Sequence, residues 1–460
     1  MKKVLSTVAA LGLVAGLAST ASAVEFKMSG NYLVEGAYLS DAYGTGIALD
    51  ETPGTDNPSD AYWLHTFEMK PTMKVNDKIS MMGVVRLADD TFWGNQAGGD
   101  TEGLSGTNDV YVHHLYMDYA SDIGKIRVGR TPAGPFGTSY RDLDSRADRV
   151  MLWPSFLAAK PWSTLFYIQK NTDNFQQAAD VTKTDVDSDT YVARLYYKTD
   201  SIDSGIHYGY MNNKTSTYAT TAPFAINGDN DDQKQELTVY GKYKMDNYFL
   251  NAELTHFFGS KKTYSSTTTL LTSDRDYDSW AGMLEVGAKI DALTPSLMYF
   301  YAQGQDINNR AAMGGDMENA LGTAGTGEMF SPLYILTGRH TGMLNNDIFS
   351  GSTTDMSLAG VHAVVASVDY AASDRLTLHG AIGWAKADEK IYGTYSTPTA
   401  SLDDEYGWEY NVGAAYKLLD NLTYEAHFGY LDTGDYFNGD STTDITENVY
   451  ILTHSLTMTF

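Results

Sequence analysis

The chain has 460 residues, with 58 Asp and Glu against 32 Lys and Arg, and its formal net charge is −26. An acidic balance of this size argues against nucleic acid as a partner. The sequence has no cysteine, so nothing in the fold depends on disulfide bonds.

The first 23 residues predict a signal peptide. Lys2 and Lys3 precede a mostly small and apolar stretch at 4–17, and Ala-Ser-Ala at 21–23 fits the pattern of signal peptidase cleavage. The apolar stretch is too short for a comfortable membrane span, and no later apolar run approaches the roughly 20 residues of a transmembrane helix. We therefore expect an exported protein whose residues 24–460 form one domain, with a net charge of −28 once −26 loses the two lysines.

Short polar turns and long polar loops alternate along the rest of the chain. The turns contain Asn, Asp, Gly and Ser, which tolerate the backbone conformations of tight hairpins. Eight turns fall at 76–78, 121–124, 155–161, 200–204, 246–247, 291–293, 372–374 and 420–421. Nine long loops fall near 39–60, 94–108, 131–145, 171–188, 215–233, 259–278, 305–356, 387–404 and 433–447. These connections join eighteen strands, with short turns at one rim and long loops at the other, which is typical of an outer-membrane β-barrel.

The segments between these connections alternate apolar with polar or small residues. From Tyr406 to Tyr416 and from Leu422 to Tyr430 the even-numbered residues are apolar or aromatic, and at 236–245 the apolar set is odd-numbered. In a closed barrel the apolar set faces lipid and the polar set faces a water-filled lumen. The predicted fold class is an all-β transmembrane antiparallel up-and-down barrel of about 18 strands, with 16 as the alternative. A soluble sandwich is the other alternative, but connections of such unequal length would be odd in one.

The last strand runs to the carboxyl terminus and ends on Phe460. Its even-numbered residues form an apolar face that is interrupted only by His454, and its odd-numbered residues are mostly Thr and Ser. This ending resembles the assembly signal of bacterial outer-membrane barrels. The resemblance implies two partners, the barrel-assembly machinery and the lipid of the outer membrane.

The mature chain as a whole resembles a Gram-negative outer-membrane porin. The strand count is similar to that of the eighteen-stranded substrate-specific and alginate-export channels rather than the sixteen-stranded general porins. The most local similarity is at 125–138, KIRVGRTPAGPFGT, which continues to Asp148-Arg149-Val150. It resembles the porin strand that ends in Gly-Arg and leads into a loop folded into the pore. The resemblance implies a passive diffusion channel of the bacterial outer membrane with an inward-folding loop near 131–149, and it leaves monomer and homotrimer open.

Charged residues of both signs concentrate in this loop. If the loop folds inward, they line a narrow aqueous passage whose transverse field orients polar solutes and penalises apolar ones. On the strand before the loop, Arg127 has inward parity and Arg130 follows at the rim, while Arg86 and Arg194 have inward parity on their own strands. The candidate constriction residues are Arg127, Arg130, Arg141, Asp142, Asp144, Arg146, Asp148, Arg149, Arg86 and Arg194. The alternative is an exposed loop whose salt bridges matter little for stability.

The loop at 305–356 is the longest one and the least polar, because 329–336 reads MFSPLYIL. Loops of more than about fifteen residues usually carry function or are disordered. An apolar stretch in a loop favours burial, so this loop is expected to be a pore lid, an extra hairpin or a contact with a neighbouring subunit.

Enzyme motifs are missing from the sequence. It contains no HExxH, GxSxG or GxxxxGK, and His113 and His114 are adjacent, so on a strand they should point to opposite faces and cannot share a metal ion. We therefore expect no catalytic residue, cofactor or metal. The predicted function is a porin for small hydrophilic solutes and ions, with a barrel-embedded hydrolase and a structural or adhesive barrel as the alternatives.

Overall fold

The structure is a computed structural model that describes residues 24–40, 42–43, 46–47, 59–93, 110–142, 145–172, 187–218, 226–265, 271–306, 316–321, 330–338, 356–394, 397–439, 442 and 446–460. The predicted signal peptide at 1–23 lies outside these residues.

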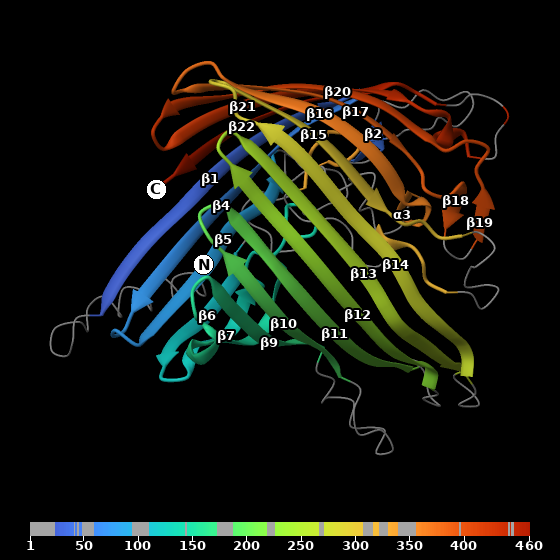
Figure 1. The fold of residues 1–460 in the computed structure, drawn as a ribbon. Helices are drawn as coiled ribbons and strands as arrows, with labels where there is room; N and C mark the ends of the chain where they lie inside the picture. The colour runs from blue at the N-terminus through green and yellow to red at the C-terminus, as the bar shows by residue number, and fades with distance from the viewer. Residues whose placement is uncertain are drawn as a thin grey trace.

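Eighteen antiparallel strands form one closed sheet, in which every strand pairs with its neighbours in the chain and β22 pairs back to β1 (Figure 1). The barrel strands are β1 (Glu25–Leu39), β4 (Asp60–Lys74), β5 (Ile79–Phe92), β6 (Tyr111–Ser121), β7 (Gly124–Pro132), β8 (Arg146–Pro154), β9 (Trp162–Thr172), β10 (Ser188–Lys198), β11 (Ile202–Tyr218), β12 (Ile226–Met245), β13 (Tyr248–Ser265), β14 (Leu271–Ala288), β15 (Leu293–Ala302), β16 (Val361–Ala371), β17 (Leu376–Lys386), β20 (Glu405–Leu419), β21 (Leu422–Thr433) and β22 (Val449–Thr459). The predicted up-and-down barrel of 18 strands is confirmed, and the alternative of 16 is wrong.

Short strands and helices lie at the long-loop rim and at one turn. Among the described residues they are the strand pairs β2 (Ala42–Tyr43) with β3 (Gly46–Ile47) and β18 (Ile391–Thr394) with β19 (Thr397–Ala400), the helix α3 (Met356–Ala359), and the 3-10 helices Ser155–Leu157 and Asp435–Asn438. In the part of the chain that the structure describes, no helix has the length and apolar character to cross a membrane.

All eight predicted turns fall at connections between consecutive barrel strands. Two predicted loops, 215–233 and 259–278, are instead largely strand, because β11 to β14 extend to between 17 and 20 residues. Their polar ends carry cross-strand ion pairs such as Lys261 with Asp232 at 3.9 Å and Lys262 with Asp274 at 3.6 Å. Beyond the lipid a strand needs no apolar face, so polar sequence alone did not mark its end.

The two faces of the wall follow the predicted alternation. On β20 the side chains of Trp408 and Val412 are 42% and 59% exposed on the outer face, whereas Glu409 and Asn411 are 0% and 3% exposed on the inner face. The prediction that Tyr406 faces lipid is wrong, because Tyr406 is buried inside the barrel. The pairing of β17 with β20 shifts register beside it, and Gly407 has a φ of 120°, so a bulge turns Tyr406 inward.

The seam between β22 and β1 closes the barrel at Phe460. The Phe460 amide donates to the Gly30 carbonyl and the Gly30 amide donates to the Phe460 carbonyl, each at 3.0 Å. The Phe460 ring stacks on Phe67 of β4 with 6.1 Å between centroids. A Cβ on Gly30 would clash with the Glu68 carbonyl oxygen and lie 2.6 Å from the Phe460 ring, so this crossing requires glycine.

One side of the barrel interior is filled by apolar side chains rather than open to water. The cluster joins inner-face residues of β13–β17, β20–β22, β1 and β4 to residues of the loops, and Tyr140, Phe300, Phe330, Leu333 and Leu336 are among its most buried members. Burial of this kind fixes loop segments inside the barrel. The lumen is therefore asymmetric.

Ala414 and Ala415 are adjacent in β20 and face opposite sides of the wall, which allows a matched test of the faces. Ala414 lies opposite Ala426, and Ala415 lies opposite Glu425. We expect Ala414→Arg to lower the free energy of unfolding by roughly 2–4 kcal/mol, because it puts a cation in lipid near the middle of the membrane. Ala415→Arg puts the same cation in the lumen beside a carboxylate and should cost little. Urea unfolding in lipid vesicles measures both, and equal losses would contradict the assignment.

Deleting Phe460 tests the terminal strand. We expect the shortened chain to be exported normally but to assemble poorly, because the seam with β1 loses two backbone hydrogen bonds and an aromatic contact. The measurement is the yield of heat-modifiable protein in outer-membrane fractions. A normal yield with normal mobility would show that Phe460 is dispensable.

Candidate functional site

The connection between β7 and β8 crosses the lumen and reaches the opposite wall. The Tyr140 hydroxyl donates to the Tyr301 carbonyl of β15 at 2.6 Å, and the Thr138 amide donates to the Glu253 carboxylate of β13. Burial raises the pKa of the Tyr140 phenol above its usual range, so its hydroxyl stays protonated and able to donate. Gly137 has a φ of 85°, and a Cβ there would lie 2.6 Å from a Glu253 oxygen. The residues 133–142 are called the first inward segment below.

Two inner-wall arginines hold the ends of the first inward segment. Arg194 of β10 donates to the carbonyls of Ala133 at 3.1 Å and Gly134 at 2.9 Å. Arg149 of β8 donates to the Ser145 carbonyl at 2.8 Å and to the Thr131 carbonyl. Both guanidinium groups lie 5.4 Å from the Tyr167 ring. These charge-assisted hydrogen bonds fix the entry and the exit of the segment.

A cavity of about 300 Å³ lies between the first inward segment and the inner faces of β8 to β12. Four of the predicted constriction residues line it together: Arg141, Asp142, Arg149 and Arg194. The Arg141 guanidinium lies 4.0 Å from the Glu236 carboxylate and 4.9 Å from the Phe257 ring. The site thus holds cations and carboxylates in a partly buried space, where charges act more strongly than in bulk water.

Several residues of this cavity were not singled out from the sequence. They are His207, Lys234, Gln169, Tyr167 and Thr190, and Glu253 lies against the segment itself. His207 accepts a hydrogen bond at its Nδ1 from Arg194 Nε at 3.0 Å. Inward parity on β9 to β13 is the signal that marks these positions, but it does not say which of them meet.

Arg127 and Arg86 face the lumen as their parity predicted, on the wall formed by β4 to β7. Arg127 makes a two-pronged contact with Asp118, with nitrogen–oxygen distances of 2.6 and 2.8 Å, and lies 3.9 Å from the Tyr116 ring. Arg86 pairs with Glu68 at 2.9 Å and with Asp89 at 2.5 Å. Neither residue lines the cavity of Arg149 and Arg194.

Arg130 and Asp148 are corrections, because the structure places them on the outer face. They pair with each other at 3.7 Å, opposite in register, on the same face as Val128 and Val150. The prediction treated the strand as ending at Arg130, whereas β7 continues to Pro132 and keeps its alternation. Arg146 is exposed at the start of β8 and contacts Tyr111 and His113. Asp144 lies outside the described residues.

His113 and His114 also differ from the prediction. Their rings lie 4.5 Å apart, because a register shift between β5 and β6 makes His113 an extra residue in the ladder and interrupts the alternation. Within the described ranges, no group of three or more His, Cys, Asp or Glu side chains is arranged to hold a metal ion.

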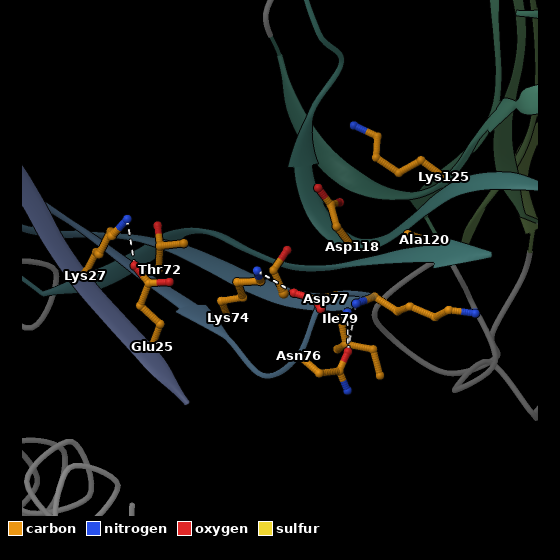
Figure 2. Close-up of a pocket in the computed structure, with 12 residues that line it drawn as sticks. Glu25, Lys27, Thr72, Lys74, Asn76, Asp77, Ile79, Asp118, Ala120 and Lys125 are labelled. Atoms are coloured by element: carbon orange, nitrogen blue, oxygen red, sulfur yellow. Dashed lines mark hydrogen bonds and ion pairs between the residues drawn. The ribbon is translucent and has the colours of Figure 1, made fainter. Parts of the chain in front are cut away.

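A second cavity, of about 380 Å³, lies at the short-turn rim (Figure 2). Lysines and carboxylates line it in pairs, with Lys27 2.8 Å from Glu25 and Lys74 2.8 Å from Asp77. Lys125 and Asp118 reach it from β7 and β6. Both cavities therefore carry both signs of charge.

Comparison with known proteins identifies what the chain resembles. A profile described as the Porin subfamily matches residues 183–458, and a search of curated proteins found no match. Among solved structures, Pseudomonas aeruginosa OccK9 (OpdG) is 13% identical with a TM-score of 0.52, over 95% of this chain and 99% of that chain. Pseudomonas aeruginosa OpdQ is 11% identical with a TM-score of 0.49, over 94% and 97%. The similarity to OccK9 shows a shared barrel fold.

Tyr140→Phe tests how the first inward segment is held. The change removes the hydrogen bond to the Tyr301 carbonyl and keeps the ring, so we expect the free energy of unfolding to fall by about 1 kcal/mol. Tyr410→Phe, at an exposed position on the outer face, is the control and should change it less. Urea unfolding in vesicles gives both values, and equal losses would contradict the contact.

Proposed function

The chain belongs to the porin subfamily, and from that premise we propose that it is a passive diffusion channel for small hydrophilic solutes and ions with a constriction at the first inward segment. It is an outer-membrane channel by family, so the finer points proposed here are the solutes and the residues that restrict them. The gradient of the solute drives passage, and no cofactor is needed.

The observation that carries the proposal is the cavity between the first inward segment and the inner wall. Arg141, Arg149 and Arg194 lie there with Asp142 and Glu236, so both signs of charge border the same partly enclosed space. A fixed field across such a space favours solutes that can orient a dipole or exchange hydrogen bonds with the wall. An apolar solute would have to displace water from these charged groups, and it could not replace the hydrogen bonds that the water makes with them.

The charges on the inner wall outside the cavity support the same proposal. Arg86 and Arg127 lie on the wall of β4 to β7 beside their carboxylate partners Glu68 and Asp118, and Asp369 and Glu285 lie on β16 and β14. Both signs of charge therefore extend along the lumen beyond the constriction. We propose that this arrangement orients polar solutes along the lumen.

Partners follow from the faces of the barrel. The outer face, with its exposed Leu, Val and aromatic side chains, suits membrane lipid, and the inner face suits small polar solutes. The barrel-assembly machinery and a homotrimer remain expectations from the sequence. The family assignment favours a channel over a barrel-embedded hydrolase or a purely structural barrel.

Ion preference depends on the balance between the rim and the lumen. The chain is strongly acidic overall, and carboxylates at the loop rim concentrate cations within a Debye length of about 8 Å at physiological salt. The inner-wall arginines oppose this effect, and most are paired with carboxylates or carbonyls. We therefore propose a weak cation preference that falls as salt rises.

Arg127 and Arg130 provide a matched pair for testing the proposal, since they carry the same charge on opposite faces of β7. Arg127→Gln leaves Asp118 in the lumen without its guanidinium partner, so we expect a stronger cation preference. Arg130→Gln makes the same charge change on the outer face and should shift it less. Reversal potentials in a salt gradient, measured on single channels in planar bilayers at low salt, report both.

The outcomes separate the alternatives. Steady ohmic steps whose reversal potential responds mainly to Arg127→Gln support the channel and its charged lumen. Equal shifts for the two variants would mean that the inner wall does not set ion preference. A folded protein that gives no steps would contradict the channel itself.

A further inference from the structure

A second segment of the chain lies inside the barrel, on the side away from the charged cavity. Residues 330–338, called the second inward segment, belong to the longest predicted loop, and Phe330, Leu333, Tyr334, Ile335 and Leu336 in it are all at most 1% exposed. The Phe330 ring contacts Tyr140 of the first inward segment with 5.0 Å between centroids. Residues 330–338 therefore pack inside the barrel, which for this segment favours the predicted pore lid over a hairpin or a subunit contact.

One buried carboxylate holds the main chain of the second inward segment. Glu409 Oε1 accepts hydrogen bonds from the amides of Tyr334 at 2.6 Å and Ile335 at 2.8 Å, and Oε2 accepts one from Leu336 at 2.8 Å. Asn411 donates to the same carboxylate at 2.7 Å. Consecutive amides that point at one anion form a compact binding site for it. A buried carboxylate is tolerated only with such compensation.

The inner wall under the second inward segment has room for it because three of its residues are glycines. A Cβ on Gly383 would lie 2.6 Å from Leu333, one on Gly413 would lie 2.7 Å from the Tyr334 hydroxyl, and one on Gly429 would lie 3.2 Å from the Tyr334 Cβ. These glycines come from β17, β20 and β21, the strands around Glu409. Larger side chains at these positions would push the segment into the lumen.

We infer that Glu409 is a positioning residue that anchors the second inward segment to the wall and so sets the open cross-section of the channel. The carboxylate fixes the orientation of the segment, because its two oxygens accept hydrogen bonds from three successive amides. The three glycines and the apolar contacts allow the segment to pack closely against the wall. The Tyr334 hydroxyl adds a contact with His427 Nδ1 at 3.0 Å. The effect on conduction rests on the channel function proposed above, whereas the anchoring does not.

Thiol labelling tests the anchor without reference to conduction. The chain has no cysteine, so Thr337→Cys introduces a single thiol at a position that is 2% exposed. In the otherwise unchanged chain we expect slow reaction with a water-soluble maleimide. With Glu409→Ala added, the rate should rise about tenfold or more, the order expected when amides lose a buried charged acceptor. The matched control is Glu425→Gln, which removes a carboxylate from the same wall and should leave the rate unchanged.

Single-channel recording tests the consequence. Glu409→Ala should give noisier current steps whose size differs from that of the unchanged chain, because the released segment no longer keeps a fixed position against the wall. Glu425→Gln removes an equal charge and should keep the step size. Unchanged labelling and unchanged steps for Glu409→Ala would overturn the inference. Labelling that changes as expected in a protein that never conducts would leave the anchor standing and refute the proposed function.

An engineered disulfide bridge tests the inference if Glu409→Ala does not assemble. Leu333→Cys with Gly383→Cys joins the segment to the wall at a point where a Cβ on Gly383 lies 3.2 Å from Leu333 Cγ. If anchoring is the role of Glu409, oxidation of this pair should restore assembly of Glu409→Ala, and reduction should remove it again. Failure of the closed bridge to restore assembly would overturn the inference.

Discussion

The structure depends on one constraint: a chain that crosses lipid as strands must pair every backbone amide and carbonyl within the sheet. The seam at Gly30 and Phe460 meets that constraint by joining the last residue to the first strand. Closure then fixes the rest, because each strand must alternate between lipid and lumen. The polar residues that remain inside, such as Glu409 and Arg194, are the ones available for function.

Charged side chains inside the barrel hold main-chain groups of the two inward segments. Arg149 and Arg194 donate to carbonyls at the ends of the first inward segment, and Glu409 accepts from amides of the second. The positive side chains thus contact carbonyl oxygens, and the negative side chain contacts amide N–H groups. The two segments touch at Tyr140 and Phe330 within the apolar cluster, whereas Arg141 and Asp142 of the first inward segment line the charged cavity.

The sequence predicted the strands, turns and most faces, because period-two alternation and turn chemistry are local properties. The sequence did not predict the side-chain directions that depend on strand pairing. The bulges that turn Tyr406 inward and bring His113 beside His114 arise from the register with the partner strands. It also could not say which inward residues meet. Glu409 was on the predicted inner face, but its partner Tyr334 is 75 residues away in a loop. Arg130 was misplaced because a polar strand end does not differ from a loop in composition.

We propose that a water-filled but narrow passage runs past the charged cavity of this barrel. Swelling of liposomes that contain the purified protein, measured with a series of neutral sugars of increasing size, tests it most directly. The account predicts rapid swelling with the smallest sugars and a steep loss of rate as size increases, because the two inward segments leave only part of the lumen open. Equal rates for all sizes, or no swelling by folded protein, would contradict it.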